Sequence, residues 1–211
     1  LYKKFTEKTG IKVNVVSGKD KALQKRIIEE GENCIADLYI TADAGRLGAF
    51  QEKGMFQRVS SKALKAAIPS NFRSSYWFGI AKRARVIYYD PSRTNPPSNL
   101  TYEDLADPKY KGKVVIRKSN NVYNQSLVSS LIANNGKKKT AEWAKGLVNN
   151  MARKPKGNDR AQILAVAAGE ADYAVANTYY IALMLSGKKG PEQQAAAKKI
   201  KPFFPNQDKR G

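Results

Sequence analysis

Three tyrosines stand at points where the sequence predicts that a β-strand leads into an α-helix. Tyr123 lies in the stretch IRKSNNVYNQSL, and Tyr179 and Tyr180 lie in AVANTYYIAL. In each stretch, small amide and hydroxyl residues come directly before the phenol. The carboxyl ends of strands form the ligand edge of an α/β domain, and helix N-termini there expose N–H groups that favour an anion. The three phenols are therefore candidates for binding a ligand.

The adjacent pair at Tyr179 and Tyr180 is unusual for a core helix. Two consecutive residues in the middle of a helix point about 100° apart and cannot share one face. In the first turn, however, both side chains can lean toward a point beyond the helix end. A second adjacent pair, Tyr88 and Tyr89, lies in a predicted strand, where one side chain faces each side.

A hard, highly charged cation would give a reason to gather three phenols near the guanidinium of Arg83. Tyrosinate is a hard, anionic oxygen donor, and ferric iron is the obvious partner for it. A free phenol has a pKa of about 10, so at neutral pH it ionises only if a strong Lewis acid replaces its proton. Spacing alone nevertheless favours simple packing, or stacking against a sugar, over a metal site.

Histidine, which serves catalysis and zinc binding in many proteins, is absent from the chain, and cysteine occurs only once. The chain has no histidine, which excludes His-based catalytic triads and His-ligated zinc sites within it. The one cysteine, Cys34, cannot form an internal disulfide, and we expect it to pack as a small apolar residue at the entry to a strand. No run of about 18 apolar residues predicts a membrane-spanning helix.

The charge of the chain is strongly positive. Its 211 residues include 38 Lys and Arg against 18 Asp and Glu, a net charge of +20. Such a charge favours an anionic partner, and a basic nucleic-acid-binding protein is one hypothesis. The basic residues are scattered, however, and the aromatic-and-basic signature of an RNA-binding sheet is absent. We therefore expect no nucleic-acid partner.

The first part of the chain alternates helical and strand-like patterns, as α/β domains with parallel strands do. Helices are predicted over residues 1–10, 21–31 and 44–54, and strands over residues 11–16 and 35–40. Thr41 and Asp43 are expected to cap the helix that follows them.

A long β-branched and aromatic stretch, residues 76–93, is predicted to be a strand that crosses between two lobes. By alternation, Arg83 and Arg85 would share one face of it. The second lobe then has strands and helices in turn. The predicted strands are residues 113–117 and the start of 171–180, and the predicted helices are residues 121–136, 140–151, 159–170, the segment from the tyrosine pair onward, and 191–199.

These elements predict two α/β lobes joined by hinge strands, with a ligand cleft between them. We expect an incomplete N-terminal lobe over residues 1–82, a C-terminal lobe over 83–204, and the start of a return crossing over 205–211. The chain begins inside an amphipathic helix without Met and stops at a turn. We therefore expect a fragment that lacks an N-terminal strand and a C-terminal section.

Four stretches together resemble the ferric-iron-binding periplasmic proteins of bacterial ABC importers, with the cyanobacterial branch nearest. They are ADLYITADAGRLGAFQEKG, AKRARVIYYDPSR, TYEDLADPKYKGKVVIRKSNNVYNQSLVSSLIA and AGEADYAVANTYYIALML. The segment LADPKYKGK is shared widely among periplasmic binding proteins, whereas the Tyr in NNVYNQSL and the pair in NTYY are far more specific. The resemblance covers essentially the whole chain.

This resemblance implies a type II periplasmic binding protein fold and a site in which tyrosinates hold Fe(III). The implied metal ligands are Tyr123, Tyr179 and Tyr180, and Arg83 would balance the phenolate charge or a bound synergistic anion. The protein would be a periplasmic monomer that delivers ferric iron, or a ferric chelate, to an inner-membrane ABC permease and would not be an enzyme. A type II binding protein for a polyamine, thiamine or phosphorylated organic ligand stays open as the alternative.

Overall fold

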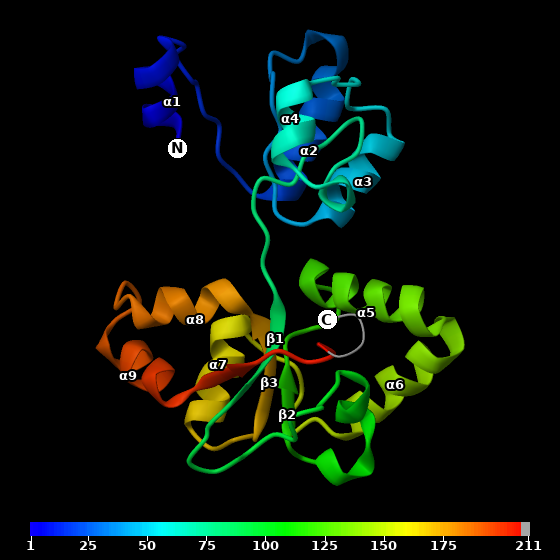
Figure 1. Cartoon of the computed structure of the whole chain (residues 1–211), viewed down its shortest axis with the longest axis vertical. Helices are drawn as coiled ribbons and strands as arrows, with labels where there is room; N and C mark the ends of the chain where they lie inside the picture. Colours follow the sequence, from blue (N-terminus) through cyan, green and yellow to red (C-terminus); the bar gives the residue numbers. More distant parts are fainter. Residues whose placement is uncertain (208–211) are drawn as a thin grey trace. The chain divides into compact units, whose positions relative to one another are not determined.

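The computed structural model describes residues 1–207 and divides into two units, Leu1–Gly79 and Ile80–Gly211 (Figure 1). The predicted limits of the lobes, at residues 82 and 204, stay predictions. The return crossing predicted over 205–211 lies partly outside the described residues, which end at 207.

The first unit consists of helices joined by extended segments. The helices are α1 (Tyr2–Thr9), α2 (Asp20–Glu30), α3 (Ala44–Glu52) and α4 (Lys62–Ala67), with 3-10 turns at Gly31–Asn33 and Ser70–Phe72. The three predicted helices are confirmed. The two predicted strands, over 11–16 and 35–40, are wrong: within residues 1–79 the only β-pairing is a single bridge between Arg73 and Phe78. A β-favouring sequence forms a strand only beside a partner that completes its hydrogen bonds.

A small aromatic and ionic cluster holds the first unit around α2 and α3. The rings of Phe50 and Phe56 lie 5.2 Å apart, edge to face, and Tyr39 lies 5.2 Å from Phe50. The Asp20 carboxylate accepts hydrogen bonds from the hydroxyls of Tyr39 and Thr41. Thr41 is thus held by α2 rather than capping α3.

Two smaller predictions in this unit have different outcomes. Asp43 does cap α3, since its Oδ1 accepts from the N–H of Gly45 at 3.1 Å. Cys34 is half-buried and ends the 3-10 turn Gly31–Asn33. It does not lead into a strand, because residues 35–40 are unpaired.

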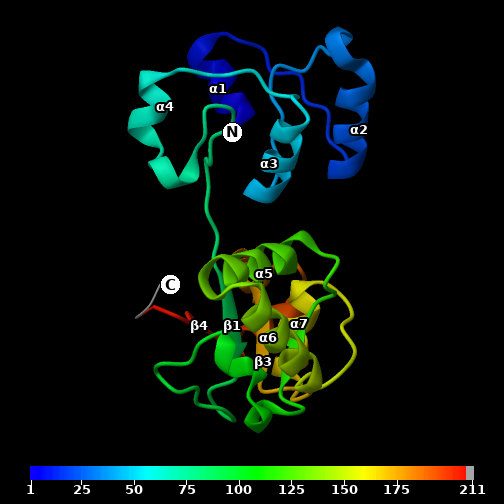
Figure 2. The ribbon, with the colours of Figure 1, turned by 90° about the vertical axis from the view of Figure 1, so that its right-hand side faces the viewer.

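The second unit is built on a four-stranded mixed sheet in the order β2-β3-β1-β4. Strands β4, β1 and β3 are labelled in Figure 2. Its strands are β1 (Arg85–Tyr89), β2 (Val114–Ile116), β3 (Tyr173–Asn177) and β4 (Lys201–Phe203). β2 and β3 are parallel, whereas β1 is antiparallel to both β3 and β4. The strand expected over 76–93 is therefore wrong in extent, because only Arg85–Tyr89 finds partners in this sheet.

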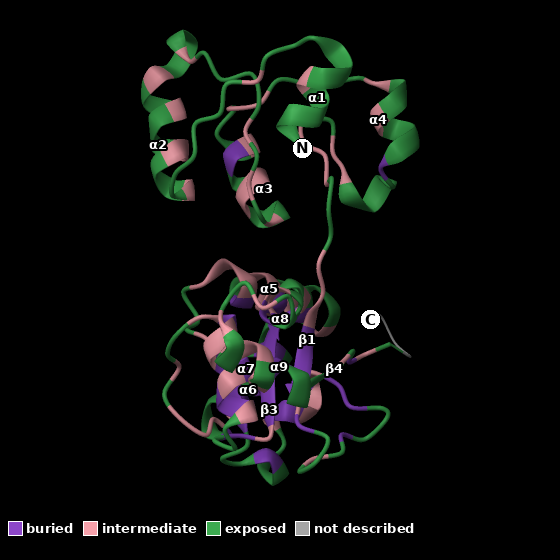
Figure 3. Ribbon diagram, turned by 90° about the vertical axis from the view of Figure 1, so that its left-hand side faces the viewer, coloured by how far each residue is buried: buried purple, intermediate pink, exposed green. Residues whose placement is uncertain are grey.

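Helices cover both faces of this sheet, and the sequence periodicity explains how. In β3, the side chains of Ala174 and Ala176 join one buried cluster with residues of α7, α8 and α9, whereas Tyr173 and Val175 join another with α5 and α6. Both faces of the strand are thus buried (Figure 3). The helices are α5 (Val122–Asn135), α6 (Lys137–Asn149), α7 (Asp159–Ala167), α8 (Thr178–Leu185) and α9 (Pro191–Lys199), with 3-10 turns at Glu103–Ala106 and Pro108–Tyr110.

The boundaries of α5 and α9 agree with the local signals, whereas α6 begins at Lys137, three residues before its predicted start. The side chain of Asn121 caps α5 by accepting from the N–H of Tyr123 at 3.0 Å, and Gly136 ends that helix with a φ of 81°. Pro191 opens α9 at its first turn. Over the described residues, none of the helices has the length and apolar character needed to cross a membrane.

Candidate metal centre

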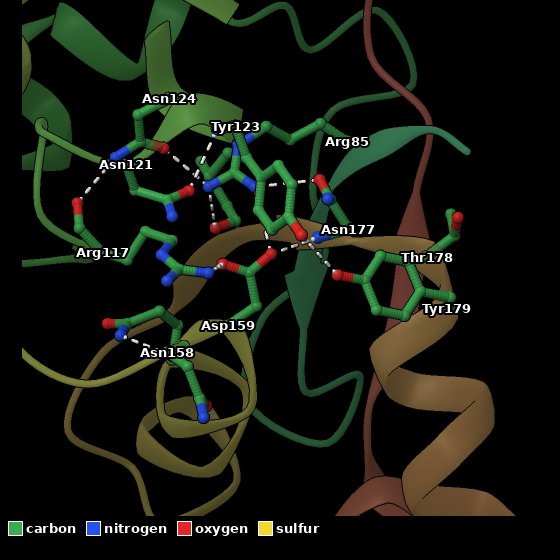
Figure 4. A network of polar contacts seen from close by, with 12 residues as sticks. Arg85, Arg117, Asn121, Tyr123, Asn124, Asn158, Asp159, Asn177, Thr178 and Tyr179 are labelled. Atoms are coloured by element: carbon green, nitrogen blue, oxygen red, sulfur yellow. Dashed lines mark hydrogen bonds and ion pairs between the residues drawn. The ribbon is translucent and has the colours of Figure 1, made fainter. Parts of the chain in front are cut away.

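The parallel pair β2 and β3 brings the predicted tyrosines to one edge of the second unit's sheet. Tyr123 is the second residue of α5, which follows β2, and Tyr179 is the second residue of α8, which follows β3 directly. The hydroxyl of Tyr179 donates to the hydroxyl of Tyr123 at 3.1 Å (Figure 4). Two phenol oxygens separated by 56 residues in the chain therefore meet at one point.

The rings of the adjacent pair at the start of α8 contact each other. The rings of Tyr179 and Tyr180 lie 4.2 Å apart between centroids, with 30° between their planes. They lean together instead of pointing to separate faces of α8. Tyr179 is 39% exposed and so remains reachable from solvent, whereas Tyr180 packs against the buried cluster of α7, α8 and α9.

Two guanidinium groups flank the ring of Tyr123. The Cζ atom of Arg83 lies 4.9 Å from the ring centroid, and the Cζ atom of Arg117 lies 5.4 Å from it. Both distances are in the range of cation–π contacts. The structure thus brings Arg83 to the tyrosines, as the resemblance implied.

Arg117 was not identified from the sequence as a site residue. It is the residue directly after β2, at the same strand end from which the segment leading to Tyr123 departs. A cation at the carboxyl end of a strand was a usable signal, since that edge carries ligands in α/β domains.

Arg85 does not join Arg83 as predicted. The strand begins at Arg85, so the two residues do not alternate along one strand and do not share a face. The Arg85 side chain is 8% exposed and forms an ion pair with Asp159, with 3.1 Å between Nη1 and Oδ2. Burial lowers the pKa of Arg85, and the charge of Asp159 opposes that effect.

Burial has the opposite effect on the phenol of Tyr179. It raises the pKa of Tyr179 well above the usual value, and the hydrogen bonds to Tyr123 and Tyr180 raise it further. Tyr179 therefore keeps its proton at all physiological pH values when no cation is bound. A Lewis acid would have to displace this proton to make the oxygen an anionic ligand.

Comparison with known proteins identifies the family. The model of the bacterial extracellular solute-binding proteins matches residues 33–206. The chain belongs to this family. In agreement, the chain resembles solved structures with the type II periplasmic binding protein fold, which confirms the predicted fold class.

Individual solute-binding proteins of high similarity are iron proteins by name. Iron uptake protein A1 from Synechocystis is 51% identical over 213 residues, and the match covers 100% of this chain and 59% of the relative. The Fe(3+)-binding periplasmic protein of Serratia marcescens is 32% identical, over 83% of this chain and 52% of the relative. The chain thus spans roughly half to three-fifths of the length of these curated relatives.

The structural relatives agree. A Trichodesmium protein (FutA, IdiA) in complex with iron and citrate ligands is 53% identical with a TM-score of 0.95, covering 100% of this chain and 67% of that chain. A ferric binding protein from Campylobacter jejuni is 45% identical with a TM-score of 0.91 and the same coverage. The resemblance to ferric-iron-binding periplasmic proteins, predicted from the sequence, is confirmed.

Proposed function

We propose that this solute-binding protein captures ferric iron in the periplasm and delivers it to an ABC permease of the inner membrane. Tyr123, Tyr179 and Tyr180 would be the ligands, each as a tyrosinate. The observation that carries the proposal is the 3.1 Å contact between the hydroxyls of Tyr179 and Tyr123. The names of the relatives, which are iron uptake and ferric-iron-binding proteins, support it.

The spacing of the two hydroxyls suits a shared cation. Adjacent oxygen ligands of an octahedral cation lie about 2.9 Å apart when each is about 2.0–2.1 Å from the ion, as for Mg²⁺. The two hydroxyls need move only slightly to reach such a separation. Binding would then replace the hydrogen bond between two phenols by two oxygen–metal bonds.

Charge balance accounts for the flanking arginine. Three tyrosinates neutralise one ferric ion, and any further anionic ligand makes the centre negative. Arg83 lies beside Tyr123 and would offset that excess. The N-termini of α5 and α8 also favour an anion at this edge. A synergistic anion bound beside the iron fits this arrangement, and citrate accompanies iron in the Trichodesmium structure.

The function we assign is binding and delivery by a monomer, with no catalytic step. A type II binding protein for a polyamine is the less favoured candidate, because a polyamine needs carboxylates whereas this site presents phenols and guanidinium groups.

The nucleic-acid hypothesis would require binding that weakens steeply with salt. The net charge of +20 fits equally well with attraction of anionic ferric chelates.

Loading the protein with ferric citrate tests the proposal directly. Tyrosinate bound to Fe(III) gives a charge-transfer band in the visible range, so the protein should turn red-orange. Tyr179→Phe should lower the intensity of the band and weaken iron binding by at least about 10–100-fold. Loss of an outer-shell partner typically lowers metal affinity by that factor, and loss of a direct ligand should lower it at least as much. Tyr89→Phe, in a pair of adjacent tyrosines on β1, is the matched control and should leave both unchanged.

Two results would contradict the proposal. One is a protein that stays colourless with ferric citrate. The other is a Tyr179→Phe variant that keeps the colour and the affinity of the parent.

A further inference from the structure

Behind the tyrosines lies a buried ionic cluster formed by Asp159, Arg85 and Arg117 (Figure 4). The Asp159 side chain is 0% exposed. Its Oδ2 lies 3.1 Å from Nη1 of Arg85, and its Oδ1 lies 3.2 Å from Nη1 of Arg117. One carboxylate thus holds two guanidinium groups, and its two oxygens are both occupied.

One arm of this cluster reaches the start of α8. The backbone N–H of Asn177 donates to Oδ2 of Asp159 at 2.8 Å, and the Asn177 side-chain oxygen accepts from Arg85 at 2.9 Å. Asn177 is the N-cap of α8, two residues before Tyr179. The position at which α8 leaves β3 therefore depends on Asp159.

The other arm reaches the start of α5. Arg85 Nη2 donates to the side-chain oxygen of Asn124 at 2.6 Å, and Asn124 Nδ2 donates to the carbonyl of Arg117 at 2.7 Å. Asn124 is the neighbour of Tyr123, and the guanidinium of Arg117 itself faces the Tyr123 ring at 5.4 Å. The first turn of α5 is thus held by the same carboxylate through Arg85 and Arg117.

A cluster of this kind is costly to bury. Ion pairs inside a protein often contribute little net stability, because desolvation of the charges offsets their attraction. A stabilising role alone does not explain why the cluster lies between the two tyrosine-bearing helix starts and contacts both. Outer-shell partners that hold metal ligands in place, in contrast, need this arrangement.

We infer that Asp159 is a positioning residue of the tyrosine site, which sets the separation of Tyr123 and Tyr179 by holding the starts of α5 and α8 together. It acts through Arg85 and Arg117 on one side and the backbone of Asn177 on the other. This inference rests on the proposed ferric-iron function. It adds to that function an anchor that does not itself touch the cation.

The test compares Asp159→Asn with two further variants of the whole protein, loaded with ferric citrate. Asp159→Asn should weaken iron binding about 10–100-fold, as outer-shell changes typically do. It should also shift the wavelength of the charge-transfer band, because the geometry of the phenolates changes. A purely structural role would lower the melting temperature without moving the band of the folded, loaded protein.

Arg117→Lys provides a second variant that keeps the positive charge near Tyr123. Lysine lacks the planar fork that bonds Asp159 while facing an aromatic ring, so affinity should fall and the band should shift in the same direction. Asp90→Asn is the matched control. Asp90 is a buried carboxylate, 6% exposed, that pairs with Arg93 and lies just past the opposite end of β1. It should leave the affinity and the band unchanged.

The outcomes separate the two proposals. If the parent protein binds no ferric iron, the proposed function fails and this inference falls with it. If the parent binds but Asp159→Asn and Arg117→Lys both keep its affinity and band, only the positioning role of Asp159 is overturned. Circular dichroism would reveal whether Asp159→Asn fails to fold. In that case Arg117→Lys alone tests the inference, and a band like that of the parent in this variant would overturn it.

Discussion

Residues 35–40 in the first unit, IADLYI, and strand β3 in the second, YAVAN, were both predicted to be strands, yet only β3 is a strand. Ile35 is 87% exposed and Leu38 is 82% exposed, whereas Ala174 and Val175 are 0% and 1% exposed. β3 pairs with β2 on one side and β1 on the other. The difference shows that β-propensity describes how well a segment fits a partnered, buried surface rather than an intrinsic backbone preference.

Core substitutions should show the largest contrast between the two units. Ile87→Ala, at the fully buried centre of β1, should lower the free energy of unfolding by about 2–5 kcal/mol because it leaves a cavity. Ile35→Ala should change it by no more than about 0.5 kcal/mol, because that side chain is already in solvent. Urea denaturation followed by circular dichroism measures both. A cost for Ile35→Ala similar to that for Ile87→Ala would show that residues 35–40 are buried in the protein in solution.

Alkaline pH should act on the second unit through its buried phenols, of which Tyr102 is one. Burial raises the pKa of Tyr102 to about 12, although the charge of Arg85 opposes this effect. Between about pH 10 and 12 the unfolded chain loses the phenol proton while the folded protein keeps it. The unfolded state thus binds fewer protons, and stability falls as pH rises, by about 1.4 kcal/mol per unit for this phenol.

Tyr102→Phe provides the measurement for this effect. The variant should lose less stability than the parent between pH 10 and pH 12 in denaturation experiments, because phenylalanine has no proton to release. At neutral pH it should lose only the hydrogen bond from the hydroxyl to the carbonyl of Arg85. An equal pH dependence in variant and parent would mean that Tyr102 ionises as readily in the folded protein as in the unfolded chain.

A smaller effect than that of Ile87→Ala is expected in the first unit, at Tyr39. Its hydroxyl donates to Asp20, and its ring packs on Phe50. Tyr39→Phe keeps the ring and should lower the free energy of unfolding by about 0.5–1.5 kcal/mol through the lost hydrogen bond. Because the Tyr39 hydroxyl donates to Asp20 and is not one of the proposed ligands, the charge-transfer band with ferric citrate should not change. A changed band would place Tyr39 in the iron site and remove the contrast between the units.

Local signals predicted much of the second unit. Asn121 and Gly136 mark the ends of α5, and Pro191 marks the start of α9, because caps and turns depend on neighbouring residues in the chain. The same signals placed Tyr123 and the tyrosine pair at strand-to-helix junctions. The extent of β1 was predicted wrongly, since its length depends on how far β3 and β4 reach beside it.

The anchoring cluster could not be predicted in the same way. Asp159 stands only as the first residue of a helix predicted over 159–170, and Arg85 was expected to share a strand face with Arg83. Their pairing joins residues 74 positions apart. No periodicity or capping rule in the sequence relates two such positions. The contact exists only once α7 packs against the sheet that contains β1.

The sequence by itself determined which groups are available to a ligand: phenols at two helix starts, a nearby guanidinium, and no histidine. It also determined the local elements that carry them, since helix starts and ends follow from short-range hydrogen bonds. Only the tertiary structure decided that Tyr123 and Tyr179 meet at 3.1 Å and that Asp159 holds both helix starts. These are contacts between distant parts of the chain, and they follow from which strands pair and in which register.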